Sequence, residues 1–365
     1  MRIAILALRR SCDYLQIGGA ESVVRRLASG LAERGHTVHY VLYGDGASET
    51  LTVNEYMSIC YCKTFNEALS VLRGGYDHVL TMYLQVRDRL RYAQFQLSKR
   101  GTAFHKVALG TPASLKEWGA FITEVSCTTR SGRVFTTSPV TKRVLSCFGA
   151  KAVLLLPPVP KDYFQTAMEK HAATDALNVM FLGRLAPEKG WKEACATFQR
   201  FRNVDGVHTC AFGYAHSAHE DGVVVEEWHD GVCVSQQRKT RLLYDPQGEE
   251  RIREILRRTD VLLLPYQSMS GTIDPPLLLL EGMAAGCGII TRPAGQVGYV
   301  YGTDTPFVIK DGDYVGQATG LIESMRKDPT ILAAEKRRIH DRMRDLPFES
   351  SHVIEQFVRA IEKDS

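Results

Sequence analysis

The sequence of 365 residues lacks an even set of cysteines and any long hydrophobic run. Its nine cysteines lie mostly inside apolar stretches, which is typical of buried free thiols in a reducing compartment and not of a disulfide framework. No apolar run approaches the roughly 18 residues of a membrane-spanning helix. The opening MRIAILALRR has too short an apolar part for a signal peptide. We therefore expect a cytoplasmic protein, and a peripheral membrane contact remains open.

Long basic runs and grouped metal ligands are also lacking. The formal net charge is only +4, and no run of lysines and arginines indicates a nucleic-acid partner. Cys60 and Cys62 have no second pair with zinc-site spacing. The spacing of His216, His219 and Glu220 is close to that of metal ligands, but no further ligand cluster accompanies them. The alternative interpretation of 214–244 is a polar surface loop. We expect no metal site and no nucleic-acid partner.

What the sequence does contain is a repeated alternation of strand and helix patterns. RIAILAL (2–8) is a continuous apolar run typical of a strand buried on both faces, a helical stripe begins at Glu21, and 37–44 predicts the next strand. The pattern restarts at 176–183, after a proline-rich segment at 152–160. The sequence therefore predicts an α/β protein of two Rossmann-like doubly wound domains facing a cleft, with residues 1–157 in the first domain and 158–349 in the second.

Paired glycines follow the first predicted strand. Gly18 and Gly19 stand where that strand gives way to a helix. Without side chains they let a ligand contact the backbone, and the helix N-terminus offers N–H groups to an anion. The alternative is a simple turn.

A second motif, FLGRLAPEKGW (181–191), follows the first strand of the second repeat. Gly183 closes the strand, and Arg184 and Lys189 lie on the turn after it. A planar guanidinium and a compact ammonium together suit a diphosphate. A surface ion pair that includes Glu188 is the alternative.

A third motif, SGTIDPPLLLLEGMAAGCGIITRP (270–293), places a carboxylate in an apolar helix. Glu281 lies among leucines, where a charge requires a partner or a ligand. A vicinal ribose diol is a suitable ligand for a carboxylate, and a buried ion pair is the alternative.

These three motifs, in this order and at these separations, resemble the retaining glycosyltransferases of family 4, which have the GT-B fold. The likeness covers nearly the whole chain, since LLLPPVPKDYF (154–164) is similar to that family's interdomain linker. The final helix, 350–365, is similar to the one that returns to the first domain. The resemblance implies an acceptor domain over 1–157, completed by 350–365, and a nucleotide-sugar donor domain over 158–349.

The resemblance also implies roles for individual residues. Arg184 and Lys189 would bind the donor diphosphate, and Glu281 would contact the ribose; these three are the expected catalytic residues. The remaining donor-binding residues would be Gly18, Gly19, Gly183, Asp274, Pro276 and Leu277. The acceptor would lie near Thr111. A UDP- or GDP-sugar would donate to a sugar, lipid-linked or natural-product acceptor with retained configuration, without a metal and without a cofactor, because cations and helix N-termini stabilise the leaving diphosphate.

Two positions depart from the family pattern. Ile273 stands where the first glutamate of an E-x7-E motif belongs, with Asp274 beside it, and the 111–119 loop has Thr111 where the family often has a histidine. His105 is expected to be structural. These departures keep two alternatives open, which are a catalytically silent GT-B subunit that supports a partner and a GT-B relative such as a nucleotide-sugar epimerase.

Overall fold

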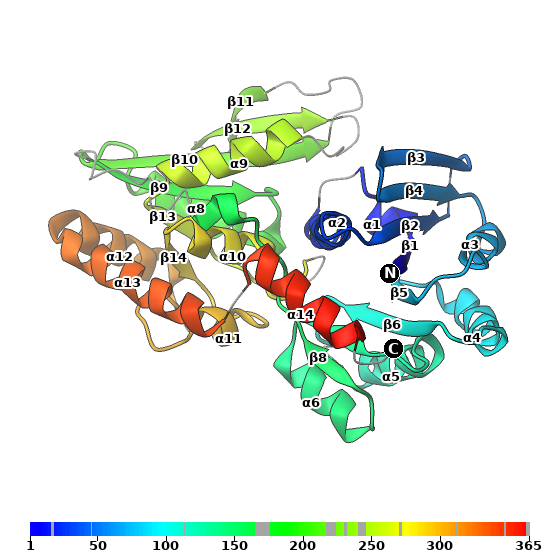
Figure 1. Ribbon diagram of the computed structural model, residues 1–365. Helices are drawn as coiled ribbons and strands as arrows, with labels where there is room; N and C mark the ends of the chain where they lie inside the picture. The colour runs from blue at the N-terminus through cyan, green and yellow to red at the C-terminus, as the bar shows by residue number, and fades with distance from the viewer. Residues whose placement is uncertain are drawn as a thin grey trace. The chain divides into compact units, whose positions relative to one another are not determined.

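In a computed structural model the chain folds into two compact units (Figure 1). Unit 1 consists of Met1–Pro158 with Phe348–Ser365, and unit 2 of Val159–Pro347. The structure describes residues 1–15, 18–44, 46–112, 114–164, 176–216, 224–229, 232–239, 246–269, 272–310, 312–346 and 348–362.

Unit 1 is built on an eight-stranded sheet with the order β3-β4-β2-β1-β5-β6-β7-β8. All neighbouring strands pair in parallel except β3, which is antiparallel to β4. The strands are β1 (Arg2–Leu8), β2 (Thr37–Tyr43), β3 (Glu49–Asn54), β4 (Met57–Cys62), β5 (His78–Met82), β6 (Ala103–Ala108), β7 (Val134–Thr136) and β8 (Ala152–Leu154). The strand order reverses between β1 and β5, which is where ligands bind in doubly wound sheets.

The apolar run of the first strand explains its central place. Ala4, Leu6 and Leu8 share one face and join a core cluster, while Ile3 and Ile5 are fully buried on the other face. A strand buried on both faces needs no polar alternation, so the continuous hydrophobic pattern identifies it correctly.

The helices of unit 1 mostly connect successive strands (Figure 1). They are α1 (Arg9–Cys12), α2 (Gly19–Ala32), α3 (Phe65–Leu72), the 3-10 turn η1 (Val86–Asp88), α4 (Arg89–Ser98), α5 (Leu115–Thr128), α6 (Pro139–Cys147) and α14 (Ser350–Glu362). The last helix, α14, packs against parts of unit 1 that are far from it in the sequence. Phe357 on α14 lies 4.4 Å from Phe135 between ring centroids, and Ile354 occupies the space that a side chain at Gly30 would need.

Unit 2 has a six-stranded sheet with the order β11-β12-β10-β9-β13-β14, parallel except for β11. The strands are β9 (Leu177–Gly183), β10 (Val207–His216), β11 (Val224–His229), β12 (Val232–Lys239), β13 (Val261–Leu264) and β14 (Gly288–Thr291). The helices are η2 (Pro187–Lys189), α8 (Trp191–Gln199), α9 (Pro246–Arg258), α10 (Leu277–Ala284), α11 (Val297–Tyr301), α12 (Tyr314–Lys327) and α13 (Pro329–Asp345). The strand order reverses between β9 and β13.

The predicted α/β architecture with two Rossmann-like sheets is confirmed, and several local predictions are wrong. The 111–119 segment is not all loop, because α5 begins at Leu115 with Ser114 as its cap. Part of the 214–244 segment, interpreted as a surface loop, forms β11 and β12. The sequence also gave no indication of the β3–β4 hairpin, whose outer strand is largely exposed.

Candidate functional site

The strongest candidate site lies at the carboxyl edge of the unit 2 sheet, on both sides of the point where the strand order reverses. The turn that carries Arg184 and Lys189 follows β9, and the segment that carries Tyr266 and Thr272 follows β13. Because β9 and β13 are neighbouring parallel strands, these two loops meet at one edge. A backbone hydrogen bond from Gln267 N to Glu188 O, 3.1 Å long, joins them.

Gly190 fixes the turn against the neighbouring strand. Its φ is +73°, and a Cβ at this position would come within 2.0 Å of the carbonyl oxygen of Pro265. Only glycine tolerates both the left-handed backbone and this close approach. The turn is therefore held to the end of β13, and the direction of Lys189 is held with it.

Lys189 has the surroundings expected of a partly buried ammonium. Its Nζ donates a hydrogen bond to the hydroxyl of Thr272 and lies 5.3 Å from the ring centroid of Tyr266. Burial, and secondly the positive charge of Arg184, lower the pKa of Lys189 to about 8. Within the described ranges Lys189 forms no ion pair. The site therefore holds a cation that an anionic ligand would stabilise.

Arg184 is less enclosed than Lys189. Its side chain is 50% exposed, and its guanidinium lies 3.6 Å from the carboxylate of Glu188. The ion pair considered as an alternative in the sequence is thus present for Arg184, while Lys189 stays outside it. A long, half-exposed arginine in an exposed ion pair is weakly held and can turn toward a stronger anion.

Glu281 lies on α10 and is 6% exposed. Burial, and secondly the negative charge of Glu281, raise the pKa of Tyr266, the tyrosine whose ring lies under Lys189. Tyr266 is 4% exposed. Lys189 and Glu281, nearly a hundred positions apart in the sequence, thus both act on Tyr266, which sequence spacing did not reveal.

The start of α10 places the other predicted donor residues. Pro276 precedes the helix, and Leu277 is its first residue. Asp274 is 3% exposed, and its Oδ1 accepts a hydrogen bond of 2.6 Å from the N–H of Gln296. Ile273 beside it is a buried apolar residue. The Asp274 carboxylate is therefore engaged inside the protein. Ser270 and Gly271, which open this motif, lie outside the described residues.

Gly183 closes β9 and lies beside a second glycine on the neighbouring strand. Its φ is +140°, and a Cβ there would meet nothing within 4 Å. Gly213 pairs with it across β10 and β9. Gly183 thus ends β9 without a side chain and leaves its backbone open to a ligand. Gly213 lies inside β10, where a Cβ would meet Leu185 at 3.5 Å. The glycine in AFGY (211–214) was the available signal in the sequence.

In unit 1 the predicted glycines open α2. Gly18 is the N-cap and Gly19 the first helical residue. A Cβ at Gly18 would lie 2.1 Å from Oε2 of Glu21, so this carboxylate folds back over the helix start in the manner of a capping box. The N-terminus of α2 therefore already has an acidic neighbour, and a bound phosphate would require Glu21 to move.

Thr111, predicted near the acceptor, is half-buried just beyond the carboxyl end of β6. His105, within that strand, is buried against His78 at 3.1 Å between ring nitrogens and accepts a hydrogen bond from Arg133 N. This arrangement gives His105 a structural role, as expected.

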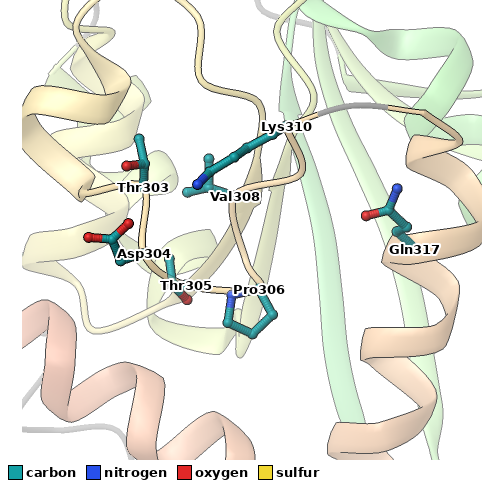
Figure 2. A pocket seen from close by; sticks show the side chains of 7 residues that line it. All are labelled: Thr303, Asp304, Thr305, Pro306, Val308, Lys310 and Gln317. Atoms are coloured by element: carbon teal, nitrogen blue, oxygen red, sulfur yellow. The ribbon is translucent and has the colours of Figure 1, made fainter.

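No group of three metal-ligating side chains occurs in the part of the chain that the structure describes. The side chains of His216, His219 and Glu220 lie outside it, so that spacing is not tested. A cavity of about 450 Å³ opens elsewhere in unit 2 (Figure 2). Its lining includes Asp304, Lys310 and Gln317 but none of the residues predicted from the sequence.

No protein-family model matches the chain, and no curated protein matches it. Solved structures do resemble it over its full length. Sucrose-phosphate synthase from Thermosynechococcus elongatus has a TM-score of 0.70 at 14% identity, covering 100% of this chain and 98% of that one. HepE from Anabaena, solved in complex with UDP, has a TM-score of 0.68 at 11% identity and covers 100% of both chains.

The catalytic domain of starch synthase IV from Arabidopsis thaliana, bound to ADP and acarbose, has a TM-score of 0.63 at 13% identity. It covers 100% of this chain and 99% of that one. Identities this low establish the fold alone. The chain therefore has the GT-B fold that these glycosyltransferases share.

Proposed function

We propose that this protein is a glycosyltransferase that uses a nucleotide-diphosphate sugar as donor and binds its diphosphate at the carboxyl edge of unit 2. The observation that carries the proposal is the position of Lys189, a partly buried ammonium without an ion pair among the described residues, beside the point where the strand order reverses. The names of the similar structures, which include complexes with UDP and UDP-glucose, support the donor class.

The chemistry follows from where charge develops. When the bond between sugar and diphosphate breaks, the diphosphate gains negative charge, and fixed cations in a partly dehydrated site stabilise it more than water does. Lys189 supplies such a cation, and Arg184 can add a second by leaving Glu188. Gly183 offers open backbone to the phosphates. In this proposal the two cations take the place of a metal ion. No cofactor is needed, because the sugar donor is itself a substrate.

The remaining assignments belong to the same proposal. Glu281 would bind the ribose hydroxyls, while Asp274, Pro276 and Leu277 would line the donor site around the start of α10. Gly18 and Gly19 would approach the phosphates from unit 1, and Thr111 would contact the acceptor. Transfer would retain configuration, and the acceptor would be a sugar, a lipid-linked sugar or a natural product.

One observation favours a second candidate, a catalytically silent GT-B subunit. Ile273 is 6% exposed where the family pattern has a glutamate, and the neighbouring Asp274 carboxylate is engaged by Gln296. The resemblance implies that this glutamate contacts the donor sugar, and here Ile273 has no carboxylate while that of Asp274 already accepts a hydrogen bond. A silent subunit with an intact diphosphate site would bind nucleotide and transfer nothing.

Calorimetry with UDP, GDP and ADP tests the donor site. We expect one of them to bind at micromolar affinity, about −8 kcal/mol. Replacing Lys189 or Arg184 with Ala removes a charged hydrogen bond and should cost roughly 1.5–3 kcal/mol, a ten- to hundredfold loss. Lys192→Ala, an exposed lysine on α8, is the matched control and should bind as the wild type does.

Unchanged affinity in both variants would refute the diphosphate site. Hydrolysis or transfer assays with UDP-glucose and GDP-mannose then separate the two candidates. Nucleotide binding with sugar release supports the transferase, whereas nucleotide binding without turnover of any donor supports the silent subunit.

A further inference from the structure

Unit 1 exposes large apolar side chains on two neighbouring helices. Val86 is 76% exposed, Leu90 68%, Leu97 71% and Leu115 91%. We refer to these four residues as the apolar patch. Leu90 and Leu97 are seven residues apart on α4 and therefore share one helix face. Val86 precedes Leu90 by four residues, at the entry to the same helix.

The two helices that carry the patch pack side by side. Arg89 on α4 forms an ion pair of 2.7 Å with Glu124 on α5 and also donates to the carbonyl of Ala120 at 3.4 Å. The helices follow β5 and β6, which are neighbouring parallel strands, so both begin at the carboxyl edge of the sheet. Val86, Leu90 and Leu115 therefore belong to one edge of unit 1.

Core packing does not explain these outward leucines. The inner face of α4 is already filled by Tyr92 and Phe95, which contact Phe104 with ring centroids at 5.9 and 6.2 Å. Both are buried. The helix is thus apolar on its outer face as well as its inner one, and an outward apolar face favours a second contact outside the unit.

The charges around the patch are mainly positive. Arg87, Arg91 and Arg100 are exposed on and beside α4, and Lys116 follows Leu115. The helix α4 contains no acidic residue, and Asp88 just before it is 4% exposed. Glu117 is the exposed acid at the start of α5. Apolar and basic side chains therefore alternate over one surface.

We propose that this surface docks unit 1 onto an anionic lipid bilayer. The patch would enter the headgroup region, and the arginines and Lys116 would contact lipid phosphates, as amphipathic helices on membrane surfaces do. A second copy of the chain fits less well, because a symmetric contact would bring the arginines of both copies together. Among the described residues no helix is long and apolar enough to span the bilayer, so the contact is peripheral.

Docking through this surface does not depend on whether unit 2 binds a donor or unit 1 an acceptor. Its consequence for the proposed function is that a lipid-linked acceptor would arrive near Thr111, which follows β6 at the same edge. Failure of the membrane contact would leave the diphosphate site untouched, so the two proposals fail separately.

Vesicle flotation tests the proposal with the full chain. We expect binding to vesicles of equal parts phosphatidylglycerol and phosphatidylcholine, and none to phosphatidylcholine alone. Binding should weaken in about 1 M NaCl, where the Debye length is about 3 Å. The variant Leu90→Glu with Leu115→Glu should lose about tenfold or more of the bound fraction. Val140→Glu, at an exposed apolar residue on α6, should bind as the wild type does.

Light scattering in the absence of lipid tests whether a second copy of the chain binds the apolar patch instead. If the wild type fails to float with anionic vesicles at low salt, the proposal is wrong. If it forms a dimer that the double variant dissolves, and neither floats, the surface is a self-interface and the membrane proposal is likewise overturned. Circular dichroism of the double variant must match the wild type for the comparison to count.

Discussion

The lowered pKa of Lys189 predicts that donor affinity depends on pH in a range where lysines usually do not titrate. With a pKa of about 8 the side chain loses its proton around pH 8, and the proposed diphosphate ligand would bind the protonated form. Raising the pH through 8 should therefore weaken binding. An unperturbed lysine, with a pKa of about 10.4, would stay charged throughout this range.

The size of the effect follows from the fraction protonated. At pH 7 about nine-tenths of the Lys189 side chains carry the proton, and at pH 9 about one-tenth, given a pKa of about 8. Affinity for the best nucleotide diphosphate should fall about tenfold between these values, which equals about 1.4 kcal/mol. Calorimetry at several pH values in buffers of matched ionic strength measures it directly.

Lys189→Arg is the matched control, because a guanidinium remains charged over this range. Titration of the nucleotide itself affects both proteins equally and cancels in their ratio. Arg184→Ala gives a further check, since removing this positive charge should move the midpoint to higher pH. If the wild type and Lys189→Arg show parallel pH profiles, Lys189 does not contact the diphosphate.

Three other predictions concern stability and thiol chemistry. In urea melts, Gly190→Ala should lower the free energy of unfolding by about 2–4 kcal/mol, because the new Cβ would collide with Pro265 O. The control Gly35→Ala, at a φ of +76° with open space around it, should lower it by only about 1 kcal/mol, and equal losses would contradict the close approach at Gly190. Glu335→Ala should lower the free energy of unfolding by about 3–5 kcal/mol, because Arg338 and Tyr301 lose their buried carboxylate partner. Glu254→Ala, which removes an exposed ion pair, should lower it by less than about 1 kcal/mol, and similar losses in the two variants would refute a stabilising role for the Glu335 contacts. A thiol reagent should modify Cys147 and Cys210 quickly in the folded protein and Cys62 slowly, since burial raises the pKa of Cys62 to about 11; mass spectrometry of partly modified protein would identify the sites, and fast loss of Cys62 would contradict its burial.

Continuous apolar runs made much of the fold predictable from the sequence. β1, β9, β13 and β14 are central or strongly buried strands, and their patterns required no knowledge of neighbours. The exposed β3 and the charged β11 escaped prediction because edge strands tolerate polar residues on both faces. The start of α5 was missed although Ser114 and Glu117 have the capping spacing, since Leu115 points to solvent and weakens the helical stripe.

The candidate site shows a similar division. The glycine turn with Lys189 was predicted, because a strand end followed by cations is a local signal. Its contacts with Tyr266 and Thr272 were not, since they join segments that only the pairing of β9 and β13 brings together. That Asp274 is engaged by Gln296 also depends on tertiary structure. The roles of these residues toward a donor, and the cleft between the units, stay predictions.

The return of α14 to unit 1 has a consequence for how the chain is synthesised. Unit 2 is one uninterrupted stretch, Val159–Pro347, so all of it is synthesised before α14. Unit 1 emerges first yet must wait, with Phe135 and the surface at Gly30 uncovered, until Phe357 and Ile354 arrive. Unit 1 is thus translated before unit 2 but completed after it. A nascent chain stalled before residue 350 would expose the apolar surface that α14 covers, and chaperones would bind there.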